Sequence, residues 1–165
     1  MMRSKWIVLI LGICILIFIS QSWAAGIPKP LKSRFMVGDP VWRELPIRSD
    51  LRLNPDKVWQ TCINTILENN FDIATMEKES GYIRTTWNEG VVVLGGSWFY
   101  KVQVSIKLVP EADLILKDSV MKVRLQVAGE ITKSGKHGIS QYFRGYDQVI
   151  LQNFFQDLQS KLGTI

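Results

Sequence analysis

Two stretches of the chain alternate between apolar and polar residues, which is the pattern of a β-strand with one buried face and one wet face. The first stretch runs from Trp98 to Val109 and the second from Met121 to Glu130. In both, lysine, arginine, glutamine or serine residues separate the valine, leucine and isoleucine residues. Strands that are wet on one side are typical of antiparallel sheets, so this pattern argues against a doubly wound parallel sheet.

Apolar residues at three- and four-residue spacing predict two amphipathic helices. Asn54 can cap the first helix, and Pro55 suits its first turn because that turn leaves its N–H groups unpaired. The second helix is predicted from Gly145 to Leu162, with Gly163 marking its end. The apolar stripe of the first helix comprises Val58, Trp59, Cys62, Ile63, Ile66 and Leu67.

A β-hairpin is predicted directly after the first helix. Residues 71–76 have the composition of a strand, residues 77–81 form a charged turn that ends in glycine, and residues 82–87 return as a second strand. This helix and hairpin would form one compact unit, because the apolar stripe of the helix needs a partner surface.

The remaining segments complete the predicted fold. A short first strand is expected at Leu51–Leu53, and Thr132–Ser140 has the glycine, lysine and serine content of a turn. Together the segments predict an α+β two-layer domain, a twisted antiparallel sheet of about five strands with two helices on one face.

The first 24 residues have the parts of a secretory signal peptide. Arg3 and Lys5 precede an apolar run from Trp6 to Ile19, and Ser22 and Ala24 have the size and spacing that signal peptidase requires. We therefore predict cleavage after Ala24. An uncleaved membrane anchor is the alternative, although this run is short against the about 20 residues that span a bilayer. Either outcome places the rest of the chain outside the cytoplasm.

Residues 25–49 are predicted to be an extended leader, and residues 50–165 to be a single domain. The leader contains four prolines and few periodic apolar residues. Phe35 and Trp42 are unexpectedly apolar for a spacer. Two explanations stay open: these residues dock on the domain's own surface, or they recognise a partner.

A second apolar segment lies between glycines, at residues 91–94. Contiguous apolar surface marks interaction sites, whereas β-branched residues also suit a strand at the edge of a sheet. In the next segment, Trp98, Phe99 and Tyr100 cannot all face inward, because neighbours in a strand point to opposite sides. The candidate partner-binding residues are therefore Phe35, Trp42, Val92, Leu94, Trp98 and Phe99.

Residues that could carry catalysis are few. His137 is the single histidine and lies in a glycine-rich turn, so a multi-histidine metal site cannot form. Cys62 falls on the apolar stripe of the first helix, where a cysteine behaves as a small hydrophobe. Glu77 and Glu79 flank Lys78 in a turn, which favours solvation over a tuned acid–base pair. We expect no enzymatic activity, no cofactor and no metal.

The charge pattern indicates what the chain does not bind. The net charge is +5, and it falls to +3 if Arg3 and Lys5 leave with the signal peptide. The remaining basic residues are scattered and form no stripe with stacking aromatics, so nucleic acid is not an expected partner. The oligomeric state is not indicated by the sequence.

The stretch from Val58-Trp59 to residues 80–87, Ser-Gly-Tyr-Ile-Arg-Thr-Thr-Trp, resembles the repeat unit of the BamC-like lipoproteins of the outer-membrane β-barrel assembly machinery. In that family a helix beginning with Val-Trp is followed by a strand, an acidic turn and a strand of the form Gly-x-Ile-x-Thr-x-Trp. The resemblance implies a helix-grip-like domain in the periplasm without enzymatic activity. Family members are lipoproteins with two such domains, whereas this chain has room for one, and Cys14 follows a bulky Ile13 inside the apolar run.

These observations lead to two functional hypotheses. The first is a non-catalytic accessory module, periplasmic or associated peripherally with the outer membrane, that binds envelope proteins during outer-membrane protein assembly. The alternative is a carrier of lipid or of another apolar small molecule, because a helix laid across a curved sheet can leave a cavity.

Overall fold

The computed structural model describes residues 26–92 and 98–163, so the predicted signal peptide and Leu94 lie outside the described residues. The chain divides into two compact units at Ser33 and Arg34. The elements, in chain order, are α2 (Lys29–Lys32), β1 (Phe35–Val37), β2 (Arg43–Pro46), α3 (Ser49–Arg52), α4 (Pro55–Glu68), β3 (Ile73–Glu77), β4 (Tyr82–Thr85), β5 (Asn88–Val92), β6 (Trp98–Val109), β7 (Lys122–Gly135), β8 (Gly138–Asp147) and α5 (Gln148–Leu162).

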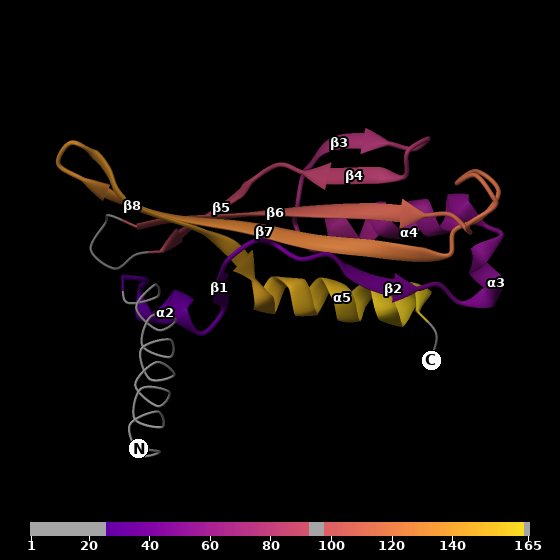
Figure 1. The fold of residues 1–165 in the computed structure, drawn as a ribbon, viewed down its shortest axis with the longest axis horizontal. Coiled ribbons are helices and arrows are strands. Elements are labelled where there is room, and N and C mark those ends of the chain that lie inside the picture. The colour runs from indigo at the N-terminus through magenta and orange to yellow at the C-terminus, as the bar shows by residue number, and fades with distance from the viewer. Residues whose placement is uncertain (1–25, 93–97, 164–165) are drawn as a thin grey trace, which may run out of the picture. The chain divides into compact units, whose positions relative to one another are not determined.

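Strands β6 and β7 form the centre of an antiparallel sheet (Figure 1). On the edge that does not face β7, the first residues of β6 pair with β5 and later residues pair with β4. Strand β4 pairs in turn with β3. Strand β7 pairs first with β2 and then with β8, and β8 pairs with β1. The other strands therefore pair with this long central pair, either directly or, for β1 and β3, through β8 and β4.

The prediction of about five strands with two helices on one face is wrong. The described residues form eight strands and four helices. Part of the difference comes from residues 34–46, because β1 and β2 pair with the sheet. Strands of three and four residues are too short to show a period-two pattern, so the sequence does not reveal them. Two explanations were open for the apolar residues of the leader. For Phe35 the first one holds, because this residue packs on the domain's own sheet.

Two further segments differ from their predictions. Residues 49–52 form the short helix α3 and not a strand. The predicted turn at residues 132–140 is shorter, because β7 continues to Gly135 and β8 begins at Gly138. The last helix begins at Gln148, where Asp147 caps it. Most of the first half of β8 is exposed on both sides, so hydrophobic alternation does not reveal it.

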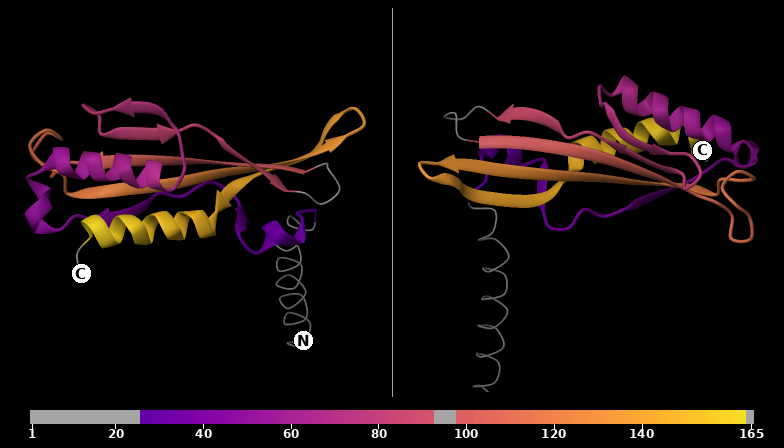
Figure 2. Two further views of the ribbon diagram at one scale, coloured as in Figure 1. Left: turned by 180° about the vertical axis from the view of Figure 1, so that it is seen from behind. Right: turned by 90° about the horizontal axis from the view of Figure 1, so that it is seen from above.

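The alternation predicted for the central strands is present. From Trp98 to Leu108 every second residue of β6 is buried, and in β7 every second residue from Val123 to Ile131 is buried. The register places these residues opposite one another, for example Val104 opposite Val127. Figure 2 shows α4 and α5 side by side, and α5 packs against β7 and β2. The apolar side of the central strands is therefore the core.

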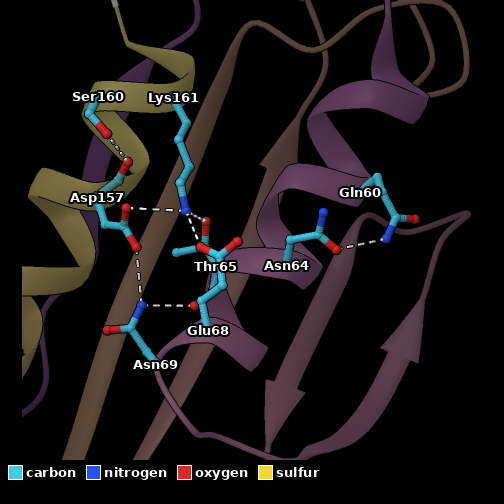
Figure 3. A network of polar contacts seen from close by, with 8 residues as sticks. All are labelled: Gln60, Asn64, Thr65, Glu68, Asn69, Asp157, Ser160 and Lys161. Carbon is cyan, nitrogen blue, oxygen red and sulfur yellow. Dashed lines mark hydrogen bonds and ion pairs between the residues drawn. The ribbon is translucent and has the colours of Figure 1, made fainter.

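A polar network joins α4 to α5 at the edge of this core (Figure 3). The Lys161 ammonium donates to Thr65 Oγ1 at 3.2 Å and forms ion pairs with Glu68 and Asp157. The Asn69 amide donates to the Thr65 carbonyl at 2.8 Å and to Asp157 at 3.1 Å. These contacts fix the end of α4 against the last turns of α5.

Candidate functional site

A cavity lies where α4 begins, and we call it the terminal cavity. Its volume is about 590 Å³. Its walls come from the first turn of α4, the β3–β4 turn, the end of β6 and the loop at residues 110–121. The lining residues are Pro55, Asp56, Trp59, Lys78, Glu79, Leu108, Ile115, Leu116 and Lys117.

The helix and hairpin walls of the terminal cavity are fixed by the core. Asn54 accepts a hydrogen bond from the Lys57 backbone at 3.2 Å, which starts α4 in the position that buries Trp59. Gly81 has a φ of +67°, and an added Cβ would lie 2.5 Å from Leu116 Cδ2. Its carbonyl accepts from the Leu108 backbone at 2.8 Å. The positive φ favours glycine here, and a Cβ would also crowd Leu108, at 3.0 Å from its Cβ and 3.1 Å from its carbonyl oxygen.

The loop at residues 110–121 is anchored at its return to the sheet. Ser119 and Val120 are fully buried, and the Val120 N–H donates to the Arg52 carbonyl of α3 at 2.8 Å. By contrast, Leu114 and Ile115 are exposed at 42% and 54%. An anchored loop that presents exposed leucine and isoleucine beside a cavity is typical of an interaction surface.

The rim of the terminal cavity carries balanced charges. Lys78 forms an ion pair with Asp56 at 3.0 Å, and both side chains are largely exposed. Glu79 and Lys117 add one charge of each sign. An apolar interior with a balanced charged rim matches the anatomy of protein-binding patches, whose cores are depleted of charge.

A second, smaller cavity of about 280 Å³ lies between the end of α4, the β5–β6 pair and the start of α5. We call it the amide pocket, because three asparagines are among its lining residues. It is lined by Asn69, Phe71, Asn88, Tyr100, Val102, Ile150, Asn153 and Phe154.

A fully buried carboxylate, that of Asp147, organises the other end of the fold. One of its oxygens accepts from the Val149 and Ile150 backbones at 2.9 Å each and so caps α5. The other accepts from the Arg34 guanidinium and from the Tyr100 hydroxyl. Burial, together with the hydrogen bond to Asp147, raises the pKa of Tyr100. Arg34 directly precedes β1, Tyr100 belongs to β6, and Asp147 caps α5. The cluster therefore connects β1 and β6 to the start of α5.

Next to this cluster, the Phe35 ring fills a hollow in the sheet. Gly129 and Gly145 face each other in the register of β7 and β8, and a Cβ on either would come within 2.8 Å of the ring. The ring also meets Tyr100 edge to face, with centroids 6.3 Å apart. Phe35 is 3% exposed and is therefore a core residue, unavailable to a partner.

The other predicted partner-binding residues are scattered. Trp98 is buried, whereas Phe99 is 53% exposed. Trp42 is half-buried, with the Arg124 guanidinium 5.6 Å from its ring centroid. Val92 pairs with Trp98 through the backbone of β5, and Leu94 lies outside the described residues. The lining of the terminal cavity includes none of the six predicted residues.

Sequence reasoning therefore missed the cavity residues Trp59, Leu108, Ile115 and Leu116 as a group. Trp59 and Leu108 look like ordinary core positions in the sequence. The available signal was the apolar triplet at residues 114–116, between the two alternating stretches that predict the central strands. Contiguous apolar residues in a surface loop mark interaction sites, and the same argument drew attention to residues 91–94 instead.

Two polar residues lie where the sequence placed them. Cys62 is fully buried in α4, and burial raises the pKa of its thiol to about 12. His137 is exposed in the turn between β7 and β8. Across residues 26–92 and 98–163, no group of three or more His, Cys, Asp or Glu side chains is placed to hold a metal ion. Within the same residues, no helix has the length and apolar character needed to cross a membrane.

Comparison with protein-family models and with curated proteins found no match to the chain. The resemblance of residues 58–87 to the BamC-like lipoproteins therefore stays a prediction. The function has to be argued from the cavities themselves.

Proposed function

We propose that this chain is an exported, non-catalytic binding module that engages protein partners of the cell envelope through the terminal cavity. The observation that carries the proposal is an apolar cavity of about 590 Å³ whose helix and hairpin walls are fixed by the core. Binding energy at protein interfaces concentrates where a few large side chains enter such preformed pockets.

The walls of the cavity favour an apolar anchor from the partner. Trp59 and Leu108 are 7% and 1% exposed, so they change little when the cavity is filled. Ile115, at 54% exposed, has more surface to lose. Burial of apolar surface stabilises a complex by roughly 25 cal/mol per Å², so the exposed loop residues contribute most of the gain.

The compartment in this proposal depends on the amino-terminal sequence. A basic start, an apolar run and small residues at a cleavage spacing favour export. The proposed location is the periplasm or the periplasmic side of the outer membrane, and the proposed partners are envelope proteins. A role in outer-membrane protein assembly follows from the resemblance to the BamC-like lipoproteins alone.

The proposal is tested by placing a charge at the cavity and measuring partner recovery. Ile115→Asp introduces a carboxylate beside the apolar walls, and Leu67→Asp makes the same kind of change at an exposed position of α4 outside the cavity. We expect Ile115→Asp to abolish recovery of envelope partners after crosslinking in cells, and Leu67→Asp to leave it unchanged. Equal recovery with both variants would contradict the proposal.

A second candidate function is carriage of lipid or of another apolar small molecule. The volume of the terminal cavity favours it, because ligand pockets commonly measure roughly 300–1,000 Å³. Native mass spectrometry of the purified protein discriminates the two. Bound lipid that is lost in Ile115→Asp supports the carrier, and an empty protein that still recovers partners supports the protein-binding module.

A further inference from the structure

The first half of β8 forms an edge of the sheet with no neighbouring strand. On one side β8 pairs with β7, and on the other side β1 reaches only residues 145–147. The Gly38 N–H adds one hydrogen bond to this pairing, to the Arg144 carbonyl at 3.1 Å. Among the strands that the structure describes, none pairs with residues 138–143 on that side. Alternate residues of a strand direct their backbone groups to the same side, so the Tyr142 N–H and C=O face this open edge.

The open edge lacks most of the features that keep an edge strand from pairing with another chain. Residues 138–143 are Gly-Ile-Ser-Gln-Tyr-Phe, with no charged residue and no proline. One bulge, at Ser140, leaves Gln141–Phe143 regular. Figure 1 shows the β7–β8 hairpin extending beyond α4 and α5, so neither helix covers this edge. Such an edge is suited to the addition of a further strand.

The sequence of the open edge is complementary to itself. Antiparallel pairing of two copies, centred on Gln141, places apolar opposite apolar, hydroxyl opposite hydroxyl and carboxamide opposite carboxamide. The pairs are Ile139 with Phe143, Ser140 with Tyr142, and Gln141 with its own equivalent. Ile139 and Tyr142, which are 69% and 52% exposed, both gain a neighbour in this arrangement.

Other two-fold registers fit less well. Centring the pair on Ser140 would place the apolar Ile139 opposite a carboxamide. Centring it on Tyr142 would require the edge at Arg144, whose carbonyl already accepts from Gly38. The register centred on residue 141 uses residues 139–143 and stops before β1.

The charges of the hairpin are compatible with pairing between two copies. Residues 139–143 carry no charge, and Arg144 falls opposite Gly138 of the second copy, so like charges do not face each other. A foreign strand would have to reproduce this order of side chains, whereas a second copy supplies it by symmetry. We infer that β8 pairs with the β8 of a second copy of this chain, antiparallel and about a two-fold axis at Gln141.

This interface and the terminal cavity lie at opposite ends of the central strands. Phe99, at the start of β6, pairs with Thr132, which pairs in turn with Tyr142 of the open edge. The terminal cavity is lined by Leu108, near the other end of β6. The inference therefore does not depend on the proposed function.

The test is disulfide crosslinking of the full chain in cells treated with a mild oxidant. Because the Tyr142 backbone faces the open edge, two copies of Gln141 form a non-hydrogen-bonded pair with Cα atoms about 4.5 Å apart, which suits a disulfide. We expect Gln141→Cys to give a product of twice the chain's mass that a reductant removes. Ser134→Cys is the control, because this residue is equally exposed but lies on β7, away from the edge, and should give no such product. Both variants carry Cys14→Ser, so that an uncleaved signal segment cannot crosslink.

A second change tests the register. Ile139→Lys, added to Gln141→Cys, should lower the yield of the crosslinked product roughly tenfold, because the two-fold axis repeats the loss of an apolar cross-strand pair. Ile139 is 69% exposed, so the fold of the single chain does not depend on it. Leu67→Lys changes a similarly exposed apolar residue on α4 and should leave the yield unchanged.

Each other outcome overturns the inference. No product at residue 141 shows that the edge stays open, and equal product at residues 141 and 134 shows random collision. A product that contains a different protein assigns the edge to a foreign strand. A yield that Ile139→Lys does not lower excludes the two-fold register. None of these results bears on the terminal cavity, which is tested separately at Ile115.

Discussion

Two hollows in the same fold differ in whether the chain fills them. The hollow over Gly129 and Gly145 is filled by Phe35, which belongs to a strand of three residues. In the sheet, Gly129 lies opposite Val102 of β6, and the terminal cavity lies six residues further along that strand, at Leu108. This cavity keeps a volume of about 590 Å³. Both are lined by aromatic or aliphatic residues, but the chain supplies a plug to only one of them.

The difference shows how binding surface can be distinguished from folding surface. Protein interiors are packed as densely as organic crystals, so a hollow that serves only stability tends to be filled. Phe35 is held in its hollow on both sides, by the ion pair of Arg34 with Asp147 and by the hydrogen bond from the Gly38 backbone to the Arg144 carbonyl at 3.1 Å. No comparable plug from the described chain enters the terminal cavity, which is what a binding site requires.

The largest expected effect comes from removing the plug. Phe35→Ala should destabilise the domain by about 3–5 kcal/mol, because it leaves a void against the two glycines. Denaturant unfolding measures this loss. The matched change at the open cavity, Ile115→Ala, should cost no more than about 0.5 kcal/mol. Similar losses of unfolding free energy at both positions would contradict the distinction between a filled hollow and an open cavity.

A smaller loss is expected when the filled hollow is narrowed. In Gly145→Ala the new Cβ would lie 2.0 Å from the Met36 carbonyl oxygen, so β1 must move. We expect about 1–3 kcal/mol of destabilisation. Hydrogen exchange should show faster exchange of the Gly38 and Gln148 amides, which donate to Arg144 and Arg34 across this contact. Unchanged exchange at these amides would show that β1 is not held as described.

The buried Cys62 thiol makes the stability of the packed core depend on pH. Burial raises its pKa to about 12, so above the ordinary thiol pKa the unfolded chain loses a proton that the folded chain keeps. The unfolded state then binds fewer protons, and the stability of the domain falls as pH rises toward about 12. No part of this decline occurs at neutral pH, which lies below the ordinary thiol pKa. Cys62→Ala should show a shallower alkaline decline in unfolding free energy, and an identical decline would contradict the assignment.

The smallest effect is expected in a labelling experiment that leaves stability almost unchanged. Ile115→Cys places a thiol at the mouth of the terminal cavity, where the side chain is 54% exposed. It should react with a maleimide in the native protein, whereas Cys62 in the same chain should react only after unfolding. Mass spectrometry of the labelled peptides measures both. Protection at residue 115 would show that the cavity is closed in solution.

Long periodic elements could be predicted from the sequence, and short ones could not. The helix beginning at Pro55 and the strands around Trp98–Val109 carry enough residues for their periods to be read. Strands β1 and β2 have three and four residues, and they pair with β8 and β7, which lie far from them in the sequence. The terminal cavity joins residues from Pro55 to Lys117, and this proximity is created by the fold alone.

The most direct test of the account is photocrosslinking in cells at two positions of comparable exposure. A photoreactive phenylalanine replaces Ile115 at the terminal cavity or Leu67 on α4, which are 54% and 52% exposed. The account predicts a discrete crosslinked envelope protein at residue 115 and none at residue 67. No crosslinked protein at residue 115, or the same products at both positions, would contradict the claim that the unfilled hollow is the binding site.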